Sequence, residues 1–189
     1  VDLCGSTERV AEFDPESARE YLDRALRLMS DAVELYGGTV SQRRGDGLLA
    51  LFGAPVAHED HPLRACLAAL SMQERVRSAV PEGHANASSM VLRVGIHSGE
   101  AVVGLVADYL GSYYRADGPT VHLASRLEQL ATPGRVLLSE ATWRHVSDQL
   151  ASTPLGAHAL RGFGQSVELH ELALSDAQSA AAPLTRRRR

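Results

Sequence analysis

The chain has 189 residues, of which 44% are hydrophobic and 22% are charged, and its formal net charge is −4 at pH 7. These values are typical of a globular protein with its own core, and the negative charge argues against a general nucleic-acid-binding protein. No apolar run approaches the ~20 residues of a membrane span and no signal peptide is evident, so we expect a cytoplasmic protein. Cys4 and Cys66 form neither a metal-binding pattern nor a secreted disulfide framework.

The first predicted elements are a strand and a long helix. Residues 1–8 predict the end of a short strand that breaks into a Gly-Ser-Thr turn. Residues 14–38 predict a helix with Asp14 as its N-cap and Pro15 at its first position, ending at a glycine pair. Its apolar residues recur every three or four positions, which indicates one buried face. They are Leu22, Ala25, Leu26, Met29, Ala32, Val33 and Tyr36.

A hairpin and a second helix follow. Two apolar runs within residues 39–52 are joined by Arg44-Gly45-Asp46-Gly47, which is a hairpin signature. Pro62 begins a helix that runs into a polar linker at residues 81–90. The run His58–His61 (HEDH) has the composition of a metal site, but its place directly before Pro62 favours a helix-capping role.

The second half of the chain continues the alternation of strands and helices. The predicted elements are two strands within residues 91–107 that turn at Ser98-Gly99, a helix over 118–134, a strand over 135–139, a helix over 140–150 and a last strand over 165–174. We therefore predict an α+β fold: a ferredoxin-like or palm-type βαββαβ core with an antiparallel-rich sheet and an additional C-terminal strand-helix-strand.

The predicted domain does not occupy the whole chain. We predict one domain over residues 1–174, truncated at its N-terminus within the first strand, because the chain starts at Val1 without a Met. Residues 175–189 are rich in Ala, Ser and Gln and end in four arginines, which predicts a disordered tail or a linker. Both ends indicate fusion to other domains in a longer protein.

Two carboxylates are candidates for chemistry because of their positions. Asp2 lies at the end of the first strand and Asp46 at the tip of the first hairpin, so in a βαββ unit both can reach one sheet edge. Close carboxylates repel one another unless a hard divalent cation joins them. The Gly5-Ser6-Thr7 turn offers backbone N–H groups to a phosphate. Together these features indicate metal-assisted nucleotide chemistry, whereas each alone is equally consistent with a plain turn or a helix entry.

Six segments carry a wider pattern. They are VDLCGST (1–7), YGGTVSQRRGDGLLALFGAP (36–55), HEDHPLRACLAAL (58–70), LRVGIHSGEAVVG (92–104), GPTVHLASRLEQLATPGRVLLSEAT (118–142) and ALRGFG (159–164). In this order and spacing they resemble the catalytic domain of the class III nucleotide cyclases, the adenylate and guanylate cyclase family, from Val1 to Leu172.

The resemblance implies a homodimer with active sites at the interface, where one chain supplies the metal site and the other contacts the base and ribose. It implies Asp2, Leu3 and Asp46 as the site of two Mg²⁺ or Mn²⁺ ions. Arg126 matches an arginine that stabilises the transition-state charge. The implied phosphate contacts are Gly5, Ser6, Thr7 and Arg161. The expected reaction converts ATP into 3′,5′-cyclic AMP and pyrophosphate by attack of the ribose 3′-oxygen on the α-phosphorus.

Three positions depart from the pattern of adenylate cyclases. Gln42 stands where a base-reading lysine is expected, and Arg115 stands where an aspartate or threonine is expected, although Asp117 lies only two residues further on. Glutamine both donates and accepts hydrogen bonds, whereas arginine cannot accept one from the adenine amino group. His122 occupies the position of an asparagine that orients the ribose.

These departures keep alternatives open. One is a cyclase that uses GTP, and another is an inactive or weak pseudo-cyclase that serves as a nucleotide-binding or dimerising regulatory module. A diguanylate cyclase is a weaker alternative, because its GGDEF-type hairpin is not matched by RRGDGLL at residues 43–49.

Overall fold

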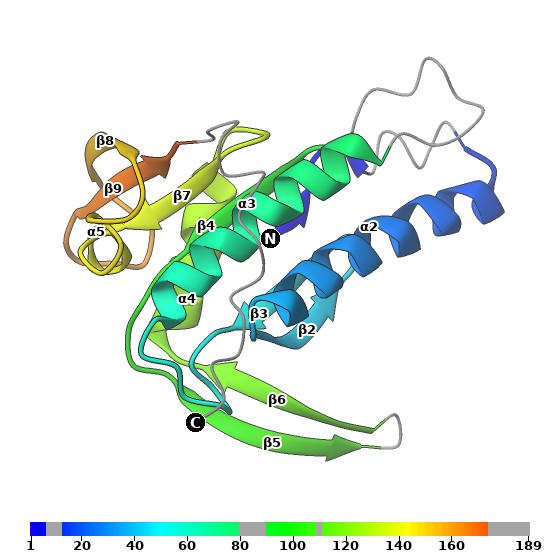
Figure 1. The fold of residues 1–189 in the computed structure, drawn as a ribbon, viewed down its shortest axis with the longest axis horizontal. Coiled ribbons are helices and arrows are strands. Elements are labelled where there is room, and N and C mark those ends of the chain that lie inside the picture. The colour runs from blue at the N-terminus through cyan, green and yellow to red at the C-terminus, as the bar shows by residue number, and fades with distance from the viewer. Residues whose placement is uncertain (7–12, 80–89, 109–110, 174–189) are drawn as a thin grey trace.

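The computed structural model describes residues 1–6, 13–79, 90–108 and 111–173 (Figure 1). Its centre is a five-stranded sheet in the order β1-β4-β7-β9-β8. The β4–β7 pair is parallel and the other pairs are antiparallel. The predicted α+β fold with a mostly antiparallel sheet is therefore confirmed. The strands are β1 (Asp2–Leu3), β4 (Leu92–Ile96), β7 (Val136–Ser139), β9 (Val167–Leu172) and β8 (Ser152–His158).

The predicted first hairpin is formed by β2 (Thr39–Arg44) and β3 (Gly47–Leu51), which pair in antiparallel register with Arg44 opposite Gly47. It continues the central sheet, because Leu48 donates its backbone N–H to the carbonyl of Val1 at 2.9 Å. The spatial order β4-β1-β3-β2 is that of the expected βαββαβ core.

A second hairpin, not foreseen in full, projects from the rest of the molecule (Figure 1). It pairs β5 (Val102–Asp108) with β6 (Gly111–Asp117). The strands predicted on either side of Ser98-Gly99 both exist, but β4 and β5 belong to different sheets. Strand β6 has no alternating apolar pattern by which it could be predicted, because only Ala116 is buried among its residues whose burial is described.

Two long helices lie side by side on one face of the molecule (Figure 1). Helix α2 (Pro15–Leu35) begins as predicted: the Asp14 carboxylate accepts the backbone N–H groups of Glu16 and Ser17, each at 3.1 Å. Helix α3 (His61–Ser78) has a proline in its first turn, also as predicted. The apolar stripe of α2 packs against α3 and the sheet, and the buried members of this core include Ala25, Met29, Val33, Cys66, Met72 and Val76.

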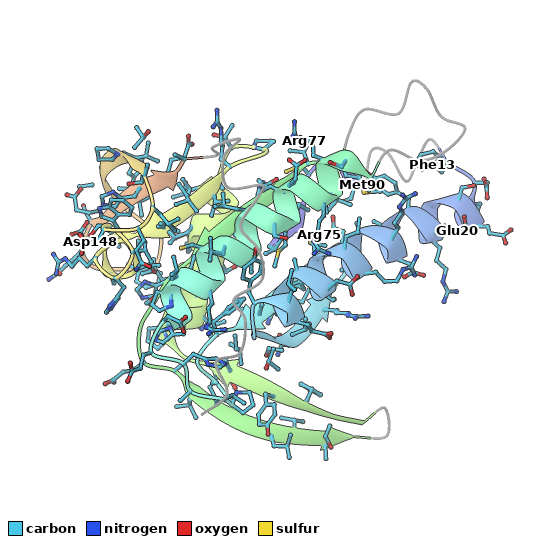
Figure 2. All side chains as sticks on the ribbon, viewed as in Figure 1. Phe13, Glu20, Arg75, Arg77, Met90 and Asp148 are labelled. Atoms are coloured by element: carbon cyan, nitrogen blue, oxygen red, sulfur yellow. The ribbon has the colours of Figure 1, made fainter. Side chains whose placement is uncertain are left out.

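The same core extends along the helix pair. In Figure 2, Phe13 and Met90 lie near one end of α2 and α3, where Met90 is buried and Phe13 packs against the core. The charged Glu20 lies on the outer, exposed side of α2. Both cysteines are free, and burial raises the pKa of the Cys66 thiol to about 12.

Helix α4 (Pro119–Leu130) packs directly on strand β4. The contact occurs at Gly95, where an added Cβ would lie 2.2 Å from the backbone nitrogen of Glu128 and 2.4 Å from the carbonyl oxygen of Ala124. A glycine is therefore required for the helix to approach the sheet this closely. Leu123 and Leu127 of α4 are buried in a second core cluster with Leu137 and Leu169.

The C-terminal part differs from the prediction in two ways. The predicted helix over 140–150 is shorter in the structure: helix α5 (Glu140–Trp143) has four residues and is followed by turns. Its N-cap, Ser139, accepts the backbone N–H of Thr142. Strand β8 was not predicted. It is an exposed edge strand that contains Pro154 and a register irregularity, so it lacks both the composition and the alternation of a half-buried strand.

No helix among the described residues is long and apolar enough to cross a membrane. The proposed tail over residues 175–189 lies outside the described part, so the boundary at residue 174 stays a prediction.

Candidate active site

The first hairpin approaches the first strand so closely that two aspartates are brought to one edge. A Cβ added to Gly47 would lie 2.4 Å from the Val1 carbonyl oxygen and 3.1 Å from Asp2 Oδ1. Only glycine allows this approach, and Asp46 is the residue directly before it. The tip of the hairpin, which carries Asp46, therefore lies beside the strand that carries Asp2. That the two carboxylates share a cation stays a prediction.

Ser6 connects the turn after β1 to the tip of the hairpin. Its hydroxyl donates a hydrogen bond to Asp46 Oδ2, and its side chain is buried. Gly5 next to it is exposed and has a φ of 65°, which glycine adopts readily. Thr7 lies outside the described residues. The contact fixes the direction of one Asp46 oxygen, and the phosphate seat at Gly5 and Ser6 stays a prediction.

The oxygen atoms at this edge suit a hard divalent cation. Mg²⁺ is commonly held by one or two carboxylates together with substrate phosphates and water. The described residues contain no group of three or more His, Cys, Asp or Glu side chains that could hold a metal. Leu3 can offer only its backbone carbonyl, because its aliphatic side chain has no ligand atom and is buried in the core. A cation held by Asp2 and Asp46 would therefore require further ligands from the substrate.

An arginine and a third carboxylate adjoin Asp2. Arg93 of β4 donates from Nη2 to Asp2 Oδ2 at 2.7 Å, and its Nε lies 3.5 Å from Glu128 Oε1. Burial raises the pKa of the Glu128 carboxyl group, and the negative charges of Asp2 and Asp46 raise it further. The hydrogen bond to Asp2 raises the pKa of Arg93. Sequence reasoning missed both residues; the only signal was an arginine inside the apolar strand LRVGI.

The two predicted base contacts each have a partner on their own strand. Gln42 Oε1 accepts from Arg44 Nε at 2.9 Å and from Arg44 Nη2 at 2.6 Å. Arg115 pairs with Asp117, with Nε 2.9 Å from Oδ2. Strands β2 and β6 are in contact, so the two pairs belong to one region. Since arginine only donates, the Gln42 oxygen faces Arg44 and its amide N–H groups remain for a ligand.

His122, Arg126 and Arg161 line one cavity of about 360 Å³, together with Gln129 and Phe163. Arg126 donates from Nη1 to Gln129 Oε1 at 2.7 Å, which holds its guanidinium beside the cavity. The structure therefore brings together the three residues that the sequence assigned to the ribose, the transition state and the phosphates.

A separate cavity of about 420 Å³ contains Asp2 and Gly47 in its lining. Helix α4 contributes to both cavities: Val121, Ala124 and Glu128 line the larger one, His122 and Arg126 line the smaller, and Ser125 lines both. These positions form two adjacent faces of one helix. Within one chain, Asp2 thus borders one cavity, whereas Arg126 and Arg161 border the other.

The HEDH run does not form a metal site. Asp60 stands at the N-cap position of α3, but its side chain caps no backbone N–H group. It accepts instead from Arg64 Nε at 2.5 Å, one helical turn along. The run thus stabilises the start of the helix through an ion pair rather than through the expected capping bond.

Comparison with known proteins identifies the family. The model of the adenylate and guanylate cyclase catalytic domain matches residues 1–173. The chain is 34% identical over 161 residues to Adenylate cyclase 1 of Rhizobium meliloti, an alignment that covers 84% of this chain and 24% of that protein. The chain therefore belongs to the adenylate and guanylate cyclase catalytic domain family.

Solved structures of cyclases have the same fold as this chain. The adenylyl cyclase CyaB from P. aeruginosa superposes with a TM-score of 0.85 at 26% identity, covering 92% of this chain and 91% of that one. The guanylyl cyclase Cya2 has a TM-score of 0.84 at 28% identity, covering 91% and 88%. The chain spans 24% to 31% of the length of its first curated relatives. These two structures, of an adenylyl and a guanylyl cyclase, thus superpose on the chain with nearly equal TM-scores.

Proposed function

We propose that this domain is a nucleotide cyclase that converts ATP into 3′,5′-cyclic AMP and pyrophosphate at sites shared between two copies of the chain. The observation that supports the proposal most is that Asp2 lines one cavity beside α4, whereas Arg126 and Arg161 line another. In the proposed homodimer, a two-fold axis places the aspartates of each copy against the arginines of its partner.

In this proposal each predicted site residue has a defined role in binding or catalysis. Asp2 and Asp46 bind the divalent cations, with the Leu3 carbonyl as a further oxygen ligand. Mg²⁺ or Mn²⁺, when bound, promotes ionisation of the ribose 3′-hydroxyl and neutralises the triphosphate. Arg126 of the other copy stabilises the charge that develops on the α-phosphate oxygens, and Arg161 binds the terminal phosphates. His122 orients the ribose.

The direct test is an assay of the purified domain with ATP or GTP in the presence of Mn²⁺. We expect the cyclic nucleotide and pyrophosphate in equal amounts, with ATP as the better substrate. If a domain confirmed as a dimer releases neither product from either nucleotide, the domain is a pseudo-cyclase with a binding or dimerising role. If GTP gives the higher kcat/KM, the adenine preference is wrong.

The base contacts provide a prediction about specificity. Arg115 offers no acceptor to the adenine amino group, and Gln42 offers a neutral donor where adenylate cyclases are expected to use lysine. The double substitution Gln42→Lys with Arg115→Asp restores both features. We expect it to raise kcat/KM for ATP about tenfold, since one well-formed hydrogen bond to a base contributes about 1–2 kcal/mol.

The measurement is kcat/KM for ATP and for GTP in parallel. The control is Gln149→Lys with Arg24→Asp, which makes the same change of net charge at exposed positions elsewhere. Unchanged kinetics in the first variant would show that β2 and β6 do not form the base pocket.

A further inference from the structure

Arg93 lies within ion-pair distance of two carboxylates, those of Asp2 and Glu128, but donates a hydrogen bond only to Asp2. Its Nη2 is bonded to Asp2 at 2.7 Å, whereas its Nε remains 3.5 Å from Glu128 Oε1. Arg93 Nε and Glu128 Oε1 are both buried, and neither has a hydrogen-bond partner within the described part of the chain. A donor and an acceptor thus face one another just beyond bonding distance.

This arrangement is energetically unfavourable unless another interaction holds Arg93 away from Glu128. A buried polar atom without a partner costs about 1–3 kcal/mol, and here a small shift of one guanidinium would satisfy two such atoms. Asp2 is what holds Arg93 in its present place, through an ion pair whose members are each about one-third exposed. Glu128, with a side chain 15% exposed, therefore offers the arginine a second hydrogen-bonding position.

We propose that Glu128 is a positioning residue that takes over Arg93 when a divalent cation binds Asp2. Cation binding neutralises the Asp2 carboxylate, and the guanidinium then closes on Glu128, where its Nε and the Oε1 atom form the missing hydrogen bond. Arginine keeps its charge throughout, so the exchange involves movement and no proton transfer. This inference rests on the cation site at Asp2 in the proposed function, but not on turnover.

Without the Glu128 charge, the exchange fails. Arg93 then has Asp2 as its single counter-charge, and an incoming cation has to break that ion pair and leave the arginine uncompensated. Residues that orient a metal ligand typically affect metal affinity by about 10–100-fold when they are replaced. We therefore expect Glu128→Gln to weaken Mn²⁺ binding about tenfold in the absence of nucleotide.

Measuring the same substitution in a domain that also carries Arg93→Gln distinguishes an effect of Glu128 through Arg93 from a general electrostatic effect of its charge. If Glu128 acts through Arg93, then adding Glu128→Gln to an Arg93→Gln domain changes the Mn²⁺ dissociation constant by less than about twofold. A general loss of negative charge predicts the same weakening in both backgrounds. The matched control is Glu171→Gln, which removes a carboxylate placed 3.6 Å from Arg135 on the remote strand β9.

The measurement is titration of the whole domain with Mn²⁺, following free Mn²⁺ by electron paramagnetic resonance, with thermal unfolding of each variant as a check on folding. Glu128→Asp retains the charge and should recover part of the affinity even where Glu128→Gln destabilises the fold. Unchanged affinity in Glu128→Gln, equal weakening in both backgrounds, or no Mn²⁺ binding by the wild-type domain overturns the proposal. Normal Mn²⁺ binding with no cyclic product contradicts only the proposed enzymatic function.

Discussion

Replacing Asp46 with asparagine is expected to lower kcat/KM for the nucleotide by about 10³-fold, the effect of losing a group that stabilises charge in a buried site. Asparagine has nearly the same shape as aspartate and can still accept the hydrogen bond from Ser6 that the native side chain accepts. The hairpin tip should therefore retain its structure, and what is lost is one negative charge beside Asp2. The assay is steady-state formation of the cyclic product at saturating Mn²⁺.

Asp31→Asn is the matched control, because it removes the same charge from the exposed side of α2. It should change kcat/KM by less than about twofold, as expected for a surface substitution away from the site. If the Asp46→Asn variant retained most of the wild-type activity, the assignment of Asp46 as a metal ligand would be wrong.

The second large effect concerns the junction between strand and helix that supports the site. Gly95→Ala is expected to lower the free energy of unfolding by about 3 kcal/mol, at the upper end for added atoms in a packed core. The new Cβ would lie 2.2–2.8 Å from backbone atoms of Glu128, Ala124 and Leu127, and a helix backbone cannot turn aside as a side chain can. Helix α4 would have to move as a unit, and with it Arg126.

The measurement is urea unfolding followed by circular dichroism. Gly104→Ala is the control: Gly104 is also in a strand, but nothing lies within 4 Å of an added Cβ. It should change the unfolding free energy by no more than about 0.5 kcal/mol. Equal stabilities of the two variants would show that α4 does not pack on β4 as closely as described.

Most of the core elements could be predicted because each has a local cause. Asp14 and Pro15 define the start of α2, its apolar positions recur with the helical period, and the glycines around Asp46 define the hairpin. The missed strands β6 and β8 have no such cause. They are stabilised by pairing with β5 and β9 while most of their side chains remain exposed, so pairing partners, rather than the residues themselves, determine them.

Only the site residues that belong to recognisable motifs could be predicted from the sequence. Asp2, Asp46, Arg126 and Arg161 could be proposed from motifs. In the structure Asp2 lines one cavity, Arg126 and Arg161 line another, and Asp46 lies at the hairpin tip next to Gly47, which approaches Asp2. The ion pair between Arg93 and Asp2 could not be found in this way, since the two residues are 91 apart in the chain and meet only through β-pairing. The same holds for the position of α4 beside both cavities, which depends on its packing at Gly95.

The shared active site is tested most directly by mixing two inactive variants, Asp46→Asn and Arg126→Ala. Each homodimer lacks one essential group in both sites, but a mixed dimer has one site with both defects and one intact site. After equilibration at equal concentrations, we predict about a quarter of the wild-type activity, since about half of the dimers are mixed and each has one working site. A mixture no more active than its separate components, despite proven subunit exchange, would contradict an active site built from two chains.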